Sequence, residues 1–364
     1  MTVPSTEGKT PYNEIIAKCN CELPSQVIHD VNVLLLEGIK IVASSAASKR
    51  VLFIGDSTVR GLFLSILRAA SQNSQLSSPF QVWYRKCPRC GAKSCRDCID
   101  HSLETSIESF VENFEWGHIV AEVAGLRLEF QYEVPSTICF KRELIRQHLR
   151  PHKRDVYAIL FNYGLWFLHL WPAHDCLKFP PPQCSLFRET VKESALWLRH
   201  VSGNDTKLVW KTSNAICESK FEKEWAKISH QWHGTKEDQR EMEMKCRDHC
   251  PFFTDERPCK REIFDSLSTE WQRNVSLTTL EDISQGWGKQ NILVQDGWEM
   301  TRDRCDYTAV ADGRHFATLD RVLALDFFAR ISDSHDFRIR AEREIKKALP
   351  NPRAAGTSDI KRPQ

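Results

Sequence analysis

The sequence of 364 residues lacks any long hydrophobic run. Met1 to Gln26 is polar and has no apolar segment of the kind that forms the core of a secretory signal peptide. The best apolar run, Val31 to Val42, contains Glu37 and Lys40 and is too short to cross a bilayer. We therefore expect no membrane span within this chain.

Strong net charge and internal repeats are missing as well. Lys and Arg number 50 against 48 Asp and Glu, and a formal charge of +2 gives no reason to expect nucleic acid or an anionic membrane as partner. No segment recurs at a fixed period, which excludes a repeat array. Apolar residues make up 41% and charged residues 27% of the chain, a composition typical of a soluble protein with a sizeable core.

Cysteine, in contrast, is abundant. Fourteen cysteines are many for a cytosolic enzyme of this length, and glycosylation sequons begin at Asn204 and Asn274. Both features favour the secretory pathway, either the Golgi lumen or the outside of the cell. Since the sequence has no signal peptide, either the signal or anchor lies outside it or the protein is cytosolic. We expect the first.

Two cysteine clusters can be read in two ways. Cys87, Cys90, Cys95 and Cys98 form two Cys-x-x-Cys pairs, which suit a tetrahedral zinc ion, although four residues between the pairs is far shorter than in a zinc ribbon. Disulfides in a lumenal insertion are the alternative that we favour. A second group, Cys246 to Cys250 with Cys259, includes His249 and also has both readings, and again a disulfide beside a surface histidine is favoured.

The most informative stretch is a short strand followed by a helix. Val51 to Ile54 is a continuous apolar run typical of a strand buried on both faces, and Gly55 allows a tight turn. Apolar residues then recur at helical spacing from Val59. Ser57 therefore lies beyond the carboxyl end of a strand, where open α/β sheets bind ligands. It can serve as a nucleophile, or it can simply cap the helix.

A second buried strand is predicted over Asp155 to Phe161, and Asn162 follows it. The Asn162 amide can anchor a turn or donate a hydrogen bond to an oxyanion. Near the other end of the chain, Asp312 and His315 are three residues apart, so both side chains can face the same way. An aspartate in that position can orient an imidazole that acts as general base. Alternatively, Asp312 caps the next helix and His315 is a surface residue.

Three of these blocks resemble one family. Gly55 to Arg60 looks like the Gly-Asp-Ser-x-x-Arg block of the PC-esterase branch of the SGNH/GDSL hydrolase superfamily, and Asp155 to Trp166 and Asp312 to His315 are similar to its later blocks. The branch includes trichome-birefringence-like and neurexophilin-and-PC-esterase proteins. The sequence departs from the superfamily pattern at the second-block glycine, for which Gly125 is only a candidate, and it lacks the transmembrane anchor common in the branch.

The resemblance implies an α/β fold, a three-layer sandwich of the SGNH type with a short parallel sheet and Cys-rich insertions. We expect an N-terminal lead-in and helix over residues 1–45 and the SGNH-like domain over residues 46–335. Its insertions would lie near 85–100 and 217–262, and residues 336–364 would form a C-terminal helix and a disordered tail.

The resemblance also implies acyl transfer through a covalent ester of Ser57, with His315 as base and Asp312 as its orienting partner. The Ser57 N–H and Asn162 would bind the oxyanion, with Asp56 and Arg60 in support, and no metal would take part. The expected substrate is an O-acyl group, foremost O-acetyl, on a carbohydrate or glycoconjugate. Water as acceptor would make the protein an esterase. A sugar hydroxyl would make it an O-acetyltransferase, with a donor such as acetyl-CoA. The alternative is an inactive SGNH-fold protein that binds carbohydrate or another partner.

Overall fold

The computed structural model describes twelve parts of the chain. They are residues 23–46, 49–72, 81–86, 99–102, 117–132, 155–162, 184–202, 205–217, 220, 266–287, 292–308 and 313–349. None of the helices in these parts is long and apolar enough to cross a membrane.

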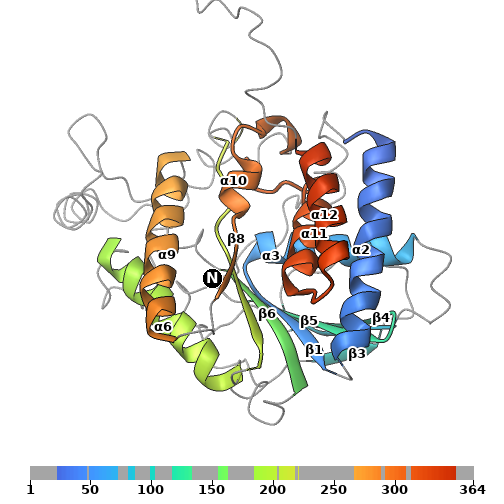
Figure 1. Cartoon of the computed structure of the whole chain (residues 1–364), viewed down its shortest axis with the longest axis horizontal. Coiled ribbons are helices and arrows are strands. Elements are labelled where there is room, and N and C mark those ends of the chain that lie inside the picture. Colours follow the sequence, from blue (N-terminus) through green and yellow to red (C-terminus); the bar gives the residue numbers. More distant parts are fainter. Residues whose placement is uncertain are drawn as a thin grey trace, which may run out of the picture.

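The described strands form one eight-stranded sheet in the order β3-β2-β4-β5-β1-β6-β7-β8 (Figure 1). The strands are β1 (Arg50–Gly55), β2 (Gln81–Lys86), β3 (Ile99–Ser102), β4 (Gly117–Val123), β5 (Leu126–Tyr132), β6 (Val156–Asn162), β7 (Lys207–Lys211) and β8 (Leu293–Gln295). Strands β5, β1, β6, β7 and β8 are mutually parallel. Strands β4, β2 and β3 extend the β5 edge in antiparallel fashion, which the expected short parallel sheet did not include.

Helices cover both faces of the sheet, so the protein is an α/β structure with three layers (Figure 1). One face carries helices α2, α3, α11 and α12, and the other carries α6 and α9. The bounds are α2 (Ser25–Ala46), α3 (Ser57–Ser71), α6 (Cys184–Ser202), α9 (Ser266–Trp287), α10 (Gly297–Thr301), α11 (Asp320–Ile331) and α12 (His335–Ala348), with a short 3-10 turn η3 (Cys305–Tyr307).

Strand β1 shows why the sheet needs both helical layers. All six of its residues are buried, and the four from Val51 to Ile54 alternate between two apolar clusters. Phe53 packs against Phe63 of α3 and Phe327 of α11, with ring centroids 5.3 and 5.0 Å apart, while Leu52 and Ile54 face the α6 and α9 side. Burying each such side chain contributes roughly 1.5–3 kcal/mol relative to exposure. The continuous apolar run of the sequence therefore reflects two hydrophobic faces.

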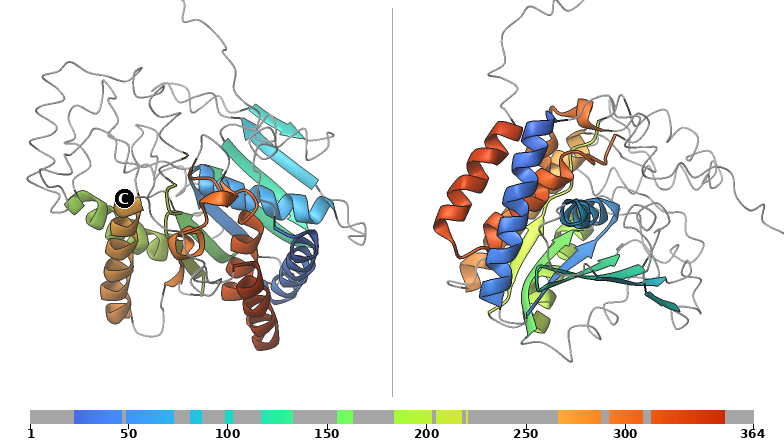
Figure 2. Two further views of the ribbon diagram at one scale, coloured as in Figure 1. Left: turned by 90° about the horizontal axis from the view of Figure 1, so that it is seen from above. Right: turned by 90° about the vertical axis from the view of Figure 1, so that its right-hand side faces the viewer.

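The first and last described helices belong to the same layer. Figure 2 shows α2 lying beside α12, and both pack on α11. Gly38 of α2 permits this packing, because a Cβ there would collide with the Phe337 ring of α12. The layer thus includes helices that the sequence placed outside residues 46–335.

Glycine is present at two positions next to the strands for different physical reasons. A Cβ on Gly55 would collide with the carbonyl oxygen of Asn162, because β1 and β6 approach closely where they end. Gly125 has φ +78° and open space around its Cα, so it serves only the tight turn between β4 and β5. That turn precedes β5 and hence lies at the amino edge of the parallel strands, opposite Ser57. Gly125, the candidate for the second-block glycine, therefore does not belong to the site at Ser57.

The two glycines yield a stability test. We expect Gly55→Ala to lower the free energy of unfolding by about 3 kcal/mol, because the backbone of β6 cannot give way to a new methyl group. Gly125→Ala, the matched control, should lose only about 1–2 kcal/mol from its left-handed φ. Urea denaturation followed by circular dichroism measures both. Equal losses would contradict the close approach of β1 and β6.

Candidate active site

Ser57 occupies the position that the sequence predicts, directly beyond the carboxyl end of β1. It is the first residue of α3, and its side chain is half-buried. The cap of this helix is Asp56, whose Oδ1 accepts hydrogen bonds from the Thr58 N–H at 2.8 Å and the Thr58 hydroxyl at 2.7 Å. Since Asp56 satisfies the helix end, the Ser57 hydroxyl is not used as a cap.

His315 meets Ser57 from the other end of the chain. Its Nε2 lies 2.8 Å from Ser57 Oγ, a hydrogen-bond distance between residues 258 positions apart. His315 is half-buried and lies in the segment that leads into α11. Asp312 falls outside the described residues, so its contact with His315 stays a prediction.

The Ser57–His315 pair lies at the end of β1, where the strand order of the sheet reverses. The chain passes from β1 to β5 on one side and later returns to β6 on the other side of β1. In open α/β sheets, a crevice forms at this switch point beyond the carboxyl ends of the strands. The topology therefore places the pair at the common location for a ligand site in this class of fold.

Asn162 and Arg60 lie at the same edge. The Asn162 carbonyl accepts from the Asp56 N–H at 3.3 Å, and its buried side-chain amide directs Nδ2 toward Thr212 O at 3.4 Å. Arg60 is half-buried in the first turn of α3. The roles of Asn162 as oxyanion donor and of Arg60 as support stay predictions.

The stretch 212–217, which follows β7, runs beside the segment of His315. The Asn214 side chain donates from Nδ2 to Arg314 O at 3.3 Å, and the Cys217 N–H donates to Gly313 O at 2.8 Å. Strand β7 ends at Lys211, and the residues that follow it are irregular. Two hydrogen bonds thus fix the backbone immediately before His315.

Lys211 is the residue of this site that the sequence interpretation missed. It is fully buried, and its Nζ donates to Asn214 Oδ1 at 2.7 Å and to Thr212 O at 3.3 Å. Burial lowers the pKa of its ammonium group to about 8, while the charges of Asp56, Asp320 and Asp296 act in the opposite direction. A lysine ending the apolar run Leu208–Trp210, just before three polar residues, was the available signal.

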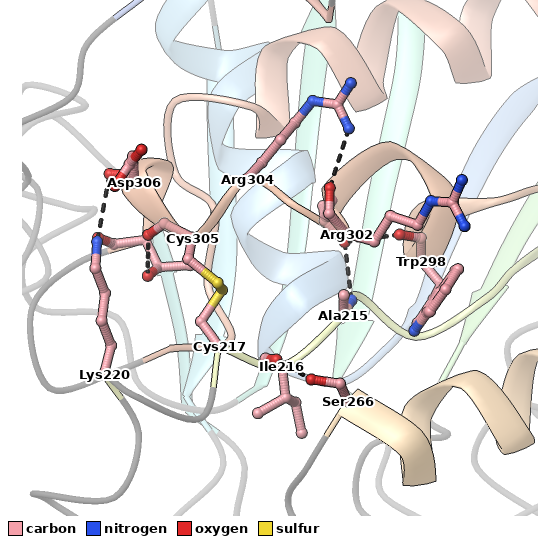
Figure 3. The surroundings of a disulfide bond; sticks show 12 residues. Ala215, Ile216, Cys217, Lys220, Ser266, Trp298, Arg302, Arg304, Cys305 and Asp306 are labelled. Atoms are coloured by element: carbon pink, nitrogen blue, oxygen red, sulfur yellow. Dashed lines mark hydrogen bonds between the residues drawn. A yellow bond between two sulfur atoms is a disulfide. The ribbon is translucent and has the colours of Figure 1, made fainter. Parts of the chain in front are cut away.

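A disulfide also holds the same region (Figure 3). Cys217 is bonded to Cys305 of η3, across a sequence separation of 88 residues. Close by, the Ala215 N–H donates to Thr301 Oγ1 at 2.8 Å, and Lys220 Nζ donates to Thr308 O at 2.8 Å. The loop that supports His315 is thereby tied to the segment following α10.

Several sequence expectations fall outside the described residues. They are the two cysteine clusters, with Cys87, Cys90, Cys95, Cys98, Cys246, Cys250 and Cys259, and the sequon at Asn204. The first cluster connects β2 to β3, whose pairing brings Lys86 opposite Ile99. Asn274 is exposed but lies within helix α9, whereas a glycosylation acceptor is expected in a surface loop.

The chain matches no protein-family model and no curated protein.

The disulfide gives a test of how the His315 segment is held. Replacing Cys217 and Cys305 by serine should lower the free energy of unfolding by roughly 2–4 kcal/mol, because the unfolded chain regains the entropy of a long loop. Hydrogen exchange of the peptide that contains Gly313 should also accelerate, since the Cys217 N–H would hold its carbonyl less firmly. Thermal unfolding and exchange mass spectrometry measure the two effects. Unchanged exchange around Gly313 would show that the disulfide does not support this segment.

Proposed function

We propose that the protein catalyses serine-dependent acyl transfer, with Ser57 as nucleophile and His315 as general base. The 2.8 Å distance between His315 Nε2 and Ser57 Oγ carries the proposal, because a base must be within hydrogen-bond reach of the proton it removes. A merely structural serine at a helix start would not need a histidine from the far end of the chain. Both residues are only partly buried, so solvent reaches them.

In the proposed reaction, the neutral His315 imidazole accepts the Ser57 proton at Nε2 while Oγ attacks the acyl carbon. The same Nε2 then returns the proton to the departing alkoxide, which leaves an acyl ester on Ser57. A second hydroxyl, activated by His315 in the same way, attacks this ester and releases the serine. Asp312 is proposed to orient the imidazole and stabilise its protonated form.

The oxyanion of the tetrahedral intermediate would form next to the start of α3. The Ser57 N–H belongs to the first turn of that helix, whose amides point away from the helix body and carry a partial positive charge. Asn162 is the last residue of the neighbouring strand β6, and its side-chain amide is proposed as a second donor. Donors fixed in place before the reaction stabilise the developing charge without reorganisation cost.

An SGNH-type esterase or O-acetyltransferase of the PC-esterase branch is the class that we propose. Three sequence blocks in the order of that family support it, together with a nucleophile after the first parallel strand and a base shortly before α11. The substrate is proposed to be an O-acetyl group on a carbohydrate or glycoconjugate. Whether water or a sugar hydroxyl accepts the acyl group distinguishes the two activities.

A fluorophosphonate probe tests the nucleophile. We expect the wild-type protein to be labelled on Ser57 and Ser57→Ala to remain unlabelled, because only an activated hydroxyl displaces fluoride at a useful rate. The free energy of unfolding of Ser57→Ala should nevertheless stay within about 1 kcal/mol of the wild-type value, since Asp56 provides the cap. Peptide mass spectrometry identifies the labelled residue. Equal labelling of both proteins would remove Ser57 from the mechanism, and no labelling of either would favour a non-catalytic binding protein.

The base and its predicted partner are tested by the rate of labelling. His315→Ala should slow labelling by at least about a hundredfold, the lower range for general-base catalysis. Asp312→Asn should also slow it severely, because an amide cannot stabilise the imidazolium and can favour the wrong tautomer. Lys207→Met, at the opposite edge of the sheet, is the control. A rate that stays at the wild-type value in both variants would remove the pair from the mechanism.

We also propose that the protein folds in the secretory pathway, which the Cys217–Cys305 disulfide supports. Material from a secretory host should carry a glycan on Asn204 or Asn274 and contain few free thiols. Intact-mass analysis with and without an alkylating reagent measures both, with Asn204→Gln and Asn274→Gln as controls. Fourteen free thiols in an unglycosylated protein that still reacts with the probe would contradict this compartment.

A further inference from the structure

The geometry points to Lys211 as a positioning residue that holds both halves of the Ser57–His315 pair in place. The Lys211 side chain is fully buried, and its hydrogen bonds go to Asn214 and Thr212 rather than to either half of the pair. Its role rests on the proposed function of that pair. A chain of contacts and three aspartates surround its ammonium group.

The first connection leads to His315. Lys211 Nζ donates to Asn214 Oδ1 at 2.7 Å, which fixes the orientation of the Asn214 amide. With its oxygen held by the lysine, the amide presents Nδ2 to Arg314 O at 3.3 Å. Arg314 directly precedes His315, so the position of the ammonium group determines where the histidine backbone lies.

The second connection leads to Ser57. Asp56 is fully buried, and among the described residues its Oδ1 bonds Thr58 whereas its Oδ2 has no hydrogen-bond partner. A buried carboxylate without a compensating cation is costly. Lys211 supplies a positive charge that interacts with Asp56, and Asp56 is the cap that starts the helix at Ser57.

Two further aspartates that interact with the Lys211 charge also lie at the starts of helices. Asp320 opens helix α11 shortly after His315, and Asp296 caps α10, and both interact with the Lys211 charge. Asp296 is also held by Arg273 at 2.6 Å. Gly297 leaves the room for this arrangement, because a Cβ there would lie 3.0 Å from Lys211 Nζ. One buried cation thus connects the starts of three helices.

Three variants separate this role from general stability. Asn214→Ala removes the connection to Arg314 and keeps every charge, Lys211→Met removes the cation, and Lys207→Met is the matched control. Lys207 lies on the same strand, but its Nζ bonds Tyr157 and Asp333 at the other edge of the sheet. We expect labelling of Ser57 by the fluorophosphonate to slow at least tenfold in the first two variants and less than twofold in Lys207→Met.

Hydrogen exchange supplies a readout that does not depend on catalysis. The peptide covering residues 313–319 should exchange faster in Asn214→Ala and in Lys211→Met than in wild type, and at the wild-type rate in Lys207→Met. Failure of the probe to label the wild-type protein would contradict the proposed function. The hydrogen-exchange rates of residues 313–319 in the variants would still decide whether Lys211 holds this segment. Wild-type exchange of residues 313–319 in Asn214→Ala would overturn the inference.

The pH dependence of the labelling rate tests the role of the Lys211 charge. Because the pKa of Lys211 is lowered to about 8, the wild-type lysine is charged below that pH and loses its charge above it. The charge compensation of Asp56, Asp320 and Asp296 then disappears, so the wild-type labelling rate should decline above about pH 8. Lys211→Met should lack this decline whatever its absolute rate. An identical decline in both proteins would assign it to another group and contradict the role of Lys211.

Discussion

Burial of β1 on both faces is the constraint on which the rest of the site depends. Phe53 is held between α3 and α11 on one face, and Leu52 and Ile54 are covered on the other. A shift of one residue in register would exchange the two faces, but each is matched to a different helical layer. The end of β1 is thereby fixed, and Ser57 is fixed with it because only Asp56 lies between the strand and the serine.

His315 is positioned in a different way, since it lies on no regular helix or strand. Its segment is held by side-chain and backbone donors from the stretch 212–217, which is itself tied to η3 by the disulfide. Irregular segments of this kind carry function when a rigid scaffold fixes them. The position of Ser57, the proposed nucleophile, thus depends on hydrophobic packing, whereas the position of His315, the proposed base, depends on a small number of polar contacts and one covalent bond. Replacing polar residues near the site should therefore displace His315 sooner than Ser57.

Local patterns were enough to predict much of this structure. The apolar runs of β1 and β6 and the helical periodicity of α3 depend on neighbouring residues, and the structure has these elements near the predicted positions. The nucleophile motif also signalled the correct end of β1. Contacts between distant segments were not accessible in this way. Fourteen cysteines allow many pairings, so spacing alone could not join Cys217 to Cys305. Likewise, no local pattern shows that β4, β2 and β3 run antiparallel at one edge.

Lys211 illustrates this limit most clearly, because its surroundings arise only from the order of strands and helices. Strand β7 ends beside β6 and β8, and the helices that start nearby carry Asp56, Asp296 and Asp320 at their amino ends. Carboxylates are favourable at helix amino ends, where the backbone amides carry partial positive charge. Bringing several of them together away from water would nevertheless be unfavourable without a cation.

Arg273 bonds the partly exposed Asp296, and the strongest attractions of Lys211 are to the buried Asp56 and Asp320. The lysine charge is therefore used mainly for the two carboxylates that adjoin the Ser57 and His315 segments. The amides of the first turn of α3 and Arg60, which lies in the same turn, are the positive groups that we propose for the oxyanion at Ser57.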